Sequence, residues 1–504
     1  MRSHRIITLL PVAVRVPFMS HVQLVSLLIL TLGLLSCGGG AGGASTGGDA
    51  GAQLVVVSAT PAASATGVAS SSAITVTFSR DLDCKTVTAS SISVGGVSGT
   101  LSCSGTQVVL QPAAPLDFGR LFQLQLADSI SDTNGQLLSG LRTWSFTTTS
   151  SLFSFLAYGD SRSGNGCDGN AVHVSLVKRM VNEPASMVFN LGDMVTGYDK
   201  STNWVQRGDC ASDASKGSLK EIIAPLQNKT PVAGLPMFYF PVMGNHDDNW
   251  GDGWYPDKFG DGFCDVFNPS LMVPNHTQKS YFQDKSSRVP HFTDTQFFSL
   301  ACSKTDSSVY PTYMYYSFDF KNTHFVVMRL NNDYNNLEEC ASGCSDPANY
   351  DQYYNKHQLD WLKSDLALAG GRSDVQHIVV LLHAPIFSSS DGHAPNVSWP
   401  ALSKLFSGNG KVHMVLQGHN HVYERSYPIY TSTSSPNGVR DDQKGTVYTT
   451  TGGGGSAVHG FRSVHPLMAV QNSDFHYLRI DVDGANVSVK AVKPDGTVMD
   501  SYSR

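Results

Sequence analysis

The sequence predicts two folded domains of different classes, an all-β domain over residues 54–149 and an α/β domain over residues 152–504. The first segment carries short apolar–polar alternations separated by turn residues, with no helical period, which is typical of half-buried strands. The second segment alternates fully apolar runs with stretches of helical spacing, as buried strands and their connecting helices do. A chain of 504 residues is long enough for both domains.

The composition is that of a globular protein with a sizeable core. Hydrophobic residues make up 41% of the chain and charged residues 15%, and the formal net charge is −6. No run or stripe of basic residues occurs, so nucleic acid is not expected as a partner.

The N-terminus is predicted to be an export signal. A positive region comes first, formed by Arg2, Arg5 and Arg15. An apolar run over 22–35 follows, which is shorter than the roughly 20 residues that a membrane span needs. The run leads into Leu34-Leu35-Ser36-Cys37, which resembles a lipobox. We therefore interpret residues 1–37 as a lipoprotein signal peptide in which Cys37 becomes lipidated.

Residues 38–53 are rich in glycine and serine and are interpreted as a flexible linker. Such a linker would hold a soluble body just off a lipid surface. The lipobox resemblance implies an exported protein that meets a membrane only through a lipid anchor at Cys37. Its expected location is the outer membrane or periplasm, or the cell surface. An uncleaved anchor helix and a start at Met19 are the alternatives.

The cysteine count agrees with an oxidising compartment. Nine cysteines are present, and eight remain when Cys37 is set aside, an even number that favours disulfides. Cys84 is predicted to pair with Cys103, since both lie in the all-β domain. The other pairings stay open, with these possibilities: Cys167–Cys210, Cys264–Cys302 and Cys340–Cys344. No Cys-x-x-Cys occurs, so a thiolate zinc site is not expected.

The all-β segment is predicted to be an Ig-like sandwich. Alternating strands are expected over residues 73–78, 107–110, 121–126 and 144–146. About seven short strands in a segment of this length are typical of that fold. The order of Thr60-Pro61, a proline-rich turn over 112–116 and a closing Trp144-Ser145-Phe146 resembles the bacterial Ig-like domains of secreted proteins. A role as spacer or platform is favoured over ligand binding.

Five apolar strands of the second domain each end at side chains that can bind metal. These side chains are Asp160, Asp193, Asn245, His383, His419 and His421. The carboxyl ends of strands in α/β sheets meet at one edge, so the six groups are expected in one cleft. Carboxylate, amide oxygen and imidazole suit Mn, Fe and Zn. A site with two ions about 3.5–4 Å apart is therefore predicted, with Asp193 between them.

The ordered motifs resemble those of the calcineurin-like metallophosphoesterase family. They are Gly159-Asp160, Gly192-Asp193, Gly244-Asn245-His246-Asp247, His383 and Gly418-His419-Asn420-His421. Within that family, the residues from Gly418 to Arg425 and the glycine run after Tyr448 are similar to those of purple acid phosphatases. The resemblance implies a four-layer αββα fold for residues 152–504.

The resemblance also implies a role for each residue. One ion would be held by Asp160, Asp193 and His421, and the other by Asp193, Asn245, His383 and His419. His246 would stand over the leaving oxygen as general acid or transition-state donor, a task that suits an imidazole of ordinary pKa about 6.5. The implied reaction is hydrolysis of a small phosphate monoester by a hydroxide that two divalent or trivalent ions (Fe, Zn or Mn) activate.

Two departures from the family pattern are present. The first motif is Asp160-Ser161-Arg162, without the histidine that many members carry as a ligand. Thr196 stands where purple acid phosphatases have a tyrosine, and the nearest tyrosine is Tyr198. The first metal is therefore expected to lack a fourth protein ligand, and no iron–tyrosinate chromophore is expected. Arg162 is predicted to contact the substrate phosphate, with a surface ion pair as the alternative.

Other readings stay open. The same metals could serve a phosphodiesterase or nucleotide hydrolase, and the missing first-motif histidine would also fit a non-catalytic surface lipoprotein. His324 and His377 are expected to be structural, whereas His459 and His476 follow the glycine run and could line the cleft. The segment 248–312 is expected to be a substrate lid or a disulfide-tied loop.

Overall fold

The computed structural model describes residues 53–114, 116–162, 167–195, 218–227, 237–247, 315–330, 350–396, 399–462 and 465–504. The predicted signal peptide, residues 38–52 of the predicted linker and the segment 248–312 lie outside these residues and stay predictions. The three open cysteine pairings also lie outside the described side chains. Among the described helices, none combines the length and the apolar character that a membrane crossing requires.

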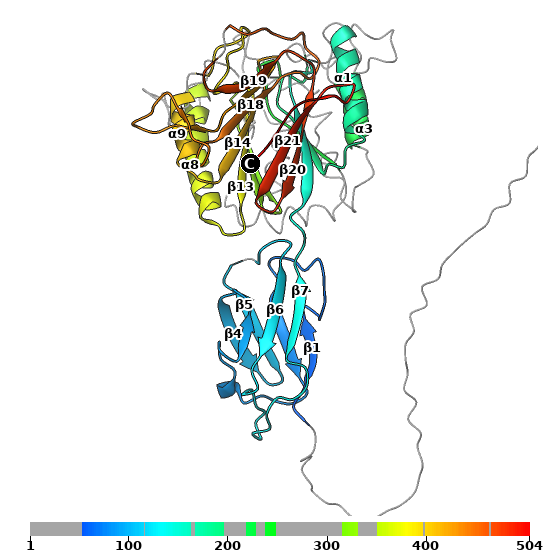
Figure 1. Cartoon of the computed structure of the whole chain (residues 1–504), viewed down its shortest axis with the longest axis vertical. Helices are drawn as coiled ribbons and strands as arrows, with labels where there is room; N and C mark the ends of the chain where they lie inside the picture. The colour runs from blue at the N-terminus through cyan, green and yellow to red at the C-terminus, as the bar shows by residue number, and fades with distance from the viewer. Residues whose placement is uncertain are drawn as a thin grey trace, which may run out of the picture. The chain divides into compact units, whose positions relative to one another are not determined.

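The N-terminal domain is a sandwich of two antiparallel sheets (Figure 1). One sheet has the strand order β1-β2-β5-β4 and the other β3-β6-β7. The strands are β1 (Val56–Thr60), β2 (Ile74–Phe78), β3 (Ile92–Val94), β4 (Gly99–Ser104), β5 (Gln107–Pro112), β6 (Leu121–Leu126) and β7 (Thr143–Thr147). The four strands expected from alternation are β2, β5, β6 and β7, and the Ig-like prediction is confirmed.

Alternating side chains fill the core of this sandwich. In β6, Phe122, Leu124 and Leu126 are buried and their neighbours are exposed, as a strand with one solvated face requires. They pack with Phe146 and residues of the opposite sheet in one apolar cluster. The predicted disulfide between Cys84 and Cys103 is present, and it adds stability because it restricts the unfolded chain.

The second domain contains two mixed sheets. The first has the order β10-β9-β8-β20-β21-β22 and the second β11-β12-β13-β14-β18-β15-β19. The first is built from β8 (Phe153–Tyr158), β9 (Met187–Asn190), β10 (Phe238–Pro241), β20 (Tyr477–Asp483), β21 (Asn486–Val492) and β22 (Val498–Ser503). The second is built from β11 (Tyr316–Phe320), β12 (Thr323–Val327), β13 (His377–Leu381), β14 (Val412–Gln417), β15 (Tyr423–Ser426), β18 (Val447–Thr451) and β19 (Met468–Asn472).

Helices cover the outer faces of both sheets, so the domain has four layers (Figure 1). Helices α1 (Cys167–Met180) and α3 (Leu219–Gln227) share an apolar cluster with β8, β9 and β10. Helices α8 (Tyr350–Gly371) and α9 (Trp399–Ser407) pack on β12, β13 and β14. The αββα prediction is confirmed. An apolar stripe of α8 is buried, and it consists of Leu359, Leu362 and Leu366.

Aromatic side chains join the two sheets across the middle of the domain. Phe155 of β8 and Phe189 of β9 both contact Phe325 of β12, with ring centroids 5.2 and 5.1 Å apart. Phe189 also lies against Phe318 of β11, at 6.2 Å. All four rings are buried. Each aromatic pair adds about 0.5–1.5 kcal/mol beyond the area it buries, so this cluster holds the sheets in a fixed relation.

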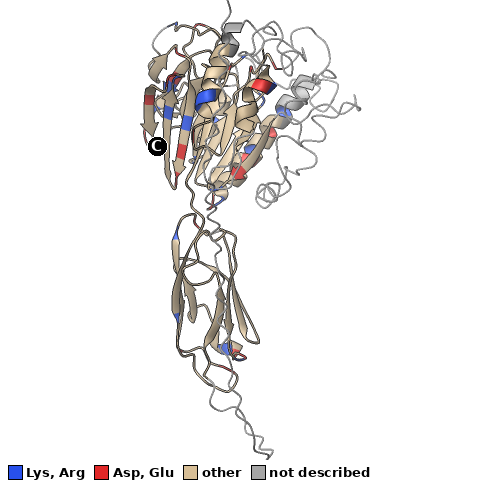
Figure 2. Cartoon of the chain, turned by 90° about the vertical axis from the view of Figure 1, so that its right-hand side faces the viewer, with Lys and Arg blue, Asp and Glu red and all other residues tan. Residues whose placement is uncertain are grey.

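Charged residues of both signs are interspersed on the strands and helices that face the viewer in Figure 2. Several form ion pairs within the first sheet and its helical layer. Arg479 of β20 lies 2.8 Å from Glu183 and 3.0 Å from Asp481.

A buried ionic network ties the β11–β12 hairpin to α8. The Nδ1 atom of His324 lies 2.7 Å from Asp319 and its Nε2 atom lies 2.9 Å from Asp365. Ser317 donates to the other oxygen of Asp365, and Arg372 donates to that of Asp319. Burial alone would lower the pKa of His324, but the two carboxylates outweigh it and raise that pKa to about 9. This arrangement agrees with the structural role expected for His324.

Replacing His324 with Leu should destabilise the protein by about 3–5 kcal/mol at pH 6, because two buried carboxylates lose their partner. Folding raises the pKa of His324 from 6.5 to about 9. The stabilisation is therefore complete below pH 6.5 and is lost as the pH rises through 9. Urea unfolding at several pH values measures this, with Lys356→Ala at an exposed ion pair as control. A difference between wild type and variant that is constant with pH would contradict the assignment.

Candidate metal centre

Five strand ends of the second domain converge, as predicted. Strands β8, β9 and β10 run parallel in the first sheet, and β13 and β14 run parallel in the second. The loops that follow these strands carry Asp160, Asp193, Asn245, His383, and His419 with His421. Strand order and direction therefore place the loops at matching ends of the two packed sheets.

The loops hold their ligand-type residues in a strained backbone. Six non-glycine residues of the described chain have positive φ, and four of them lie here: Asp160, Arg162, Asp193 and His419. Such conformations are unfavourable for residues with a Cβ atom and persist where the surrounding structure imposes them. Their concentration at one place marks it as a functional site.

Two glycines allow the second and third loops to touch. Gly192 has a φ of +97°, and a Cβ atom there would lie 2.7 Å from the Cα atom of Gly244. A Cβ atom on Gly244 would lie 2.1 Å from the backbone nitrogen of Asp193. Both approaches are closer than any side chain permits, so these positions require glycine.

One cluster of ligand atoms surrounds the Nε2 atom of His383. It lies 3.2 Å from Oδ1 of Asp193, 3.1 Å from Oδ1 of Asn245 and 3.1 Å from Nδ1 of His419. An imidazole nitrogen has at most one proton to offer to these three atoms. A metal cation would satisfy all four atoms together.

A second cluster shares Asp193 with the first. Atoms of Asp160, Asp193 and His421 lie within 4.8 Å of one another, as do those of Asp193, His383 and His419. All five side chains are buried. The Nε2 atom of His421 is 3.6 Å from Asp160, and it makes no hydrogen bond within the part of the chain that the structure describes.

Backbone carbonyls orient two of the imidazoles. The Nδ1–H of His383 donates to the carbonyl of Leu191 at 2.7 Å, and that of His421 donates to the carbonyl of Ala457 at 2.7 Å. When these rings are neutral, the proton is on Nδ1 and the lone pair is on Nε2, which faces Asp193 in His383 and Asp160 in His421. Metal-binding histidines are commonly held in this way, so the donor set fits two ions.

His246 and Arg162 both lie beside Asp193. The backbone N–H of His246 donates to Oδ1 of Asp193 at 2.9 Å, and its ring Nε2 is 3.9 Å from Oδ2. The guanidinium of Arg162 donates to the same Oδ2 through Nε at 3.2 Å and Nη2 at 2.9 Å. Arg162 thus forms an ion pair with a group of the candidate centre.

Asp247 supports the loops from behind. Its Oδ1 accepts hydrogen bonds from the backbone N–H groups of Met194 and Val195, and its Oδ2 accepts one from Gly244. It belongs to neither cluster of candidate ligands in the described chain. This geometry gives Asp247 a supporting role behind the candidate ligands.

The two carboxylates have pKa values shifted in opposite directions, and so do two of the imidazoles. Burial raises the pKa of Asp160 well above its ordinary value. Burial would raise the pKa of Asp193 as well. His383 and Arg162 outweigh this effect and hold the pKa of Asp193 well below the usual range. Burial would lower the pKa of His383, yet Asp193 raises it to about 9. Burial, reinforced by Arg162, lowers the pKa of His421 to about 2.

Two further histidines lie against the candidate ligands. The ring of His393 stacks on His419 with centroids 3.8 Å apart, and the ring of His459 stacks on His421 at 4.1 Å. His393 was missed at the sequence level, although it lies only ten residues beyond His383 in the same loop. His459 was one of two open possibilities. The other, His476, is fully buried and bonds to Thr451 and the carbonyl of Asp474.

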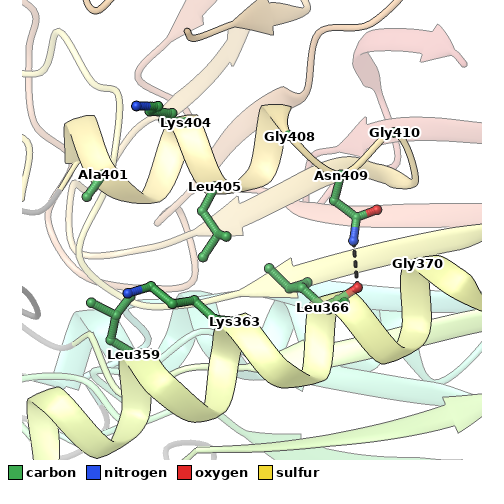
Figure 3. Close-up of a pocket in the computed structure, with 11 residues that line it drawn as sticks. Leu359, Lys363, Leu366, Gly370, Ala401, Lys404, Leu405, Gly408, Asn409 and Gly410 are labelled. Atoms are coloured by element: carbon green, nitrogen blue, oxygen red, sulfur yellow. Dashed lines mark hydrogen bonds between the residues drawn. The ribbon is translucent and has the colours of Figure 1, made fainter. Parts of the chain in front are cut away.

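A separate groove lies between α8 and α9 (Figure 3). It has an apolar floor that includes Leu359, Leu366 and Leu405, and the side chain of Asn409 donates to the carbonyl of Leu366 at one end. Its eleven lining residues include no histidine, cysteine or carboxylate. The groove therefore lacks the imidazole and carboxylate donors of the candidate centre and takes no part in the chemistry considered below.

Binding of Mn²⁺ to the metal-free protein should strengthen as the pH rises. His383 is mostly protonated below a pKa of about 9, and a ligand nitrogen must lose that proton. Affinity is expected to rise about tenfold per pH unit up to pH 8 and to level off near pH 9. Competition with a chelating dye measures it. His421→Asn should lower affinity at each pH without changing the slope, and an affinity independent of pH would contradict this prediction.

Comparison with known proteins gives two family matches. The model of the calcineurin-like phosphoesterases matches residues 153–423, which is more than half of the chain. The model of a bacterial Ig-like domain matches residues 50–148.

The related proteins include purple acid phosphatases. Purple acid phosphatase 22 of Arabidopsis thaliana is 30% identical over 176 residues, 34% of this chain and 34% of that protein. The phosphoenolpyruvate phosphatase of Allium cepa is 34% identical over 101 residues, 19% of this chain and 21% of that protein. The matched part thus spans about a third or less of these two relatives. The structure of purple acid phosphatase PPD1 from yellow lupin (Lupinus luteus) seeds has a TM-score of 0.44 at 16% identity, covering 87% of this chain and 73% of that one.

The motif order, the convergence of the strand ends and the family match agree with one another. The expected metallophosphoesterase is confirmed at the level of the family. The chain belongs to the calcineurin-like phosphoesterase family and carries an N-terminal bacterial Ig-like domain.

Proposed function

We propose that this chain hydrolyses phosphate monoesters at two metal ions bound where the five strands end. The position of Asp193 carries the proposal, because its carboxylate takes part in both clusters of candidate ligands. A carboxylate shared in this way can hold two ions a few ångströms apart, which is the arrangement of two-metal hydrolases. The similarity to purple acid phosphatases supports monoesters as the substrate class.

The ligand assignment follows the two clusters. Asp160, Asp193 and His421 would hold the first ion, and Asp193, Asn245, His383 and His419 the second. When bound, the ions supply an activated water molecule and neutralise charge on the phosphoryl group. The oxygen and imidazole donors suit Fe, Zn or Mn. Thr196 and Tyr198 lie outside the described residues, so the missing fourth ligand of the first ion stays a prediction.

In the proposed reaction, His246 serves the leaving group. Its backbone N–H donates to Asp193, its side chain is 19% exposed, and its Nε2 atom is 3.9 Å from Oδ2 of Asp193. A ring in this position can donate a proton to an ester oxygen of a substrate bound beside Asp193.

In the proposed reaction, Arg162 binds the phosphate. Its guanidinium lies beside the carboxylate that the two clusters share. The planar group carries five N–H donors, so it can contact Asp193 and phosphoryl oxygens together.

Asp193→Asn should lower kcat/KM for an aryl phosphate monoester by more than about 100-fold, since even changes behind the ligands of a metal site cost 10–100-fold. Purified protein loaded with Mn, Zn or Fe is assayed with the monoester and the matching diester. The exposed Asp483 gives the control, as Asp483→Asn should leave turnover unchanged.

Other results would redirect the assignment. Preference for the diester would favour a phosphodiesterase or nucleotide hydrolase with the same site. Absence of turnover with metal bound would favour a non-catalytic surface lipoprotein.

Arg162→Ala should raise KM for the monoester about tenfold, because a charge-assisted hydrogen bond to phosphate is worth about 1.5–3 kcal/mol. Arg162→Lys should recover part of the loss, since the ammonium keeps the charge without the paired donors. Steady-state kinetics at saturating metal measures both, with Arg440→Ala at an exposed ion pair as control. An unchanged KM with weakened metal binding would limit Arg162 to supporting Asp193.

A further inference from the structure

His459 lies against the candidate metal centre without belonging to its ligand set. Its ring is stacked nearly parallel on His421, with a centroid distance of 4.1 Å and an interplanar angle of 17°. The ring of His393 lies 5.9 Å away and covers His419. Each of the two clusters thus has one further imidazole stacked on a candidate ligand.

Four contacts fix the position of His459. Its backbone N–H donates to the carbonyl of His421 at 3.0 Å, and its own carbonyl accepts from the hydroxyl of Ser473 at 2.7 Å. Its Nδ1 atom accepts the backbone N–H of His421 at 3.1 Å. Gly392 packs on the ring edge so closely that a Cβ atom there would be 2.1 Å from Nδ1. The ring therefore has one orientation.

The two loops that carry His393 and His459 are joined to each other. The backbone N–H of Asp391 donates to the carbonyl of Gly460 at 3.0 Å, and the N–H of Gly460 donates to the carboxylate of Asp391 at 2.8 Å. The N–H of Arg462 donates to the carbonyl of Ser389 at 3.0 Å. The histidine is thus part of a rigid wall and not of a free loop.

Because Nδ1 of His459 accepts a hydrogen bond, the N–H group at Nε2 is the donor of the neutral ring. Among the residues that the structure describes, none accepts a hydrogen bond from this Nε2–H. The side chain is half-buried, so it is neither a core group nor a freely solvated one.

Arg162 contacts the same cluster of candidate ligands as His459. Its guanidinium donates to Oδ2 of Asp193, and Asp193 forms one cluster with Asp160 and His421. The ring of His459 stacks on His421 of that cluster. A substrate phosphate beside these three candidate ligands would therefore have Arg162 and the ring of His459 as neighbours.

We propose that His459 is a substrate-binding residue, whose Nε2–H donates a hydrogen bond to a phosphoryl oxygen beside the cluster of Asp160, Asp193 and His421. The inference rests on the proposed phosphatase function and adds a specific contact to it. A donor that is already held in place needs no reorganisation when charge builds on the phosphoryl oxygens. The stack on His421 and the backbone bonds supply that preorganisation.

Two substitutions separate this role from a role in orienting His421. The amide oxygen of His459→Asn can replace Nδ1 as acceptor for the N–H of His421, but the variant lacks a donor at the position of Nε2. The longer amide of His459→Gln can place an N–H near that position. We expect the Asn variant of the metal-loaded full chain to bind inorganic phosphate about tenfold more weakly and to show a KM about tenfold higher. The Gln variant should stay within about threefold of wild type.

Calorimetric titration with inorganic phosphate gives the binding constants, and bound metal and thermal midpoint are measured on the same samples. Normal phosphate binding by the Asn variant, or weak phosphate binding by a fully metal-loaded Gln variant, would overturn the proposal. If the Asn variant does not fold, the Gln variant alone decides by the same criterion. Wild-type protein that binds metal but neither binds phosphate nor turns over monoesters would overturn the proposed function instead.

Discussion

Two carboxylates buried side by side are the constraint on which the rest of the centre depends. Asp160 and Asp193 are both inaccessible to solvent, and like charges in a low-dielectric site require compensation. The backbone N–H of His419 donates to Asp160. Arg162 and His383 lie within ion-pair distance of Asp193. Bound cations would complete this compensation, which explains why the remaining groups around the carboxylates are lone-pair donors.

Holding these groups together requires unfavourable backbone conformations. Asp160, Asp193 and His419 all have positive φ, and each such residue costs on the order of 1–3 kcal/mol. The strain is sustained because the strands before these loops belong to two sheets that share one core, in which rings such as Phe155 and Phe325 interlock. The stable part of the fold thus supports a less favourable local arrangement at its edge.

The residues between the candidate ligands shape the walls of the site. Glu424 is buried and accepts hydrogen bonds from Ser388 and Ser389 in the loop after β13. Asn420, which stands between two candidate ligands, donates to Ser388 and accepts the backbone N–H of His393. The motif that supplies His419 and His421 therefore also positions the loop that carries His393.

The sequence by itself determined the classes of both domains, because alternation and apolar runs are local properties of a strand. It also singled out side chains such as Asp160, Asn245 and His383, because each lies in the loop after an apolar strand. Only the tertiary structure decided that Arg162 forms an ion pair with Asp193 and that His459 stacks on His421. These contacts join loops that meet only after the two sheets have packed, and the direction of a side chain in such a loop depends on backbone geometry and hydrogen bonds from distant segments.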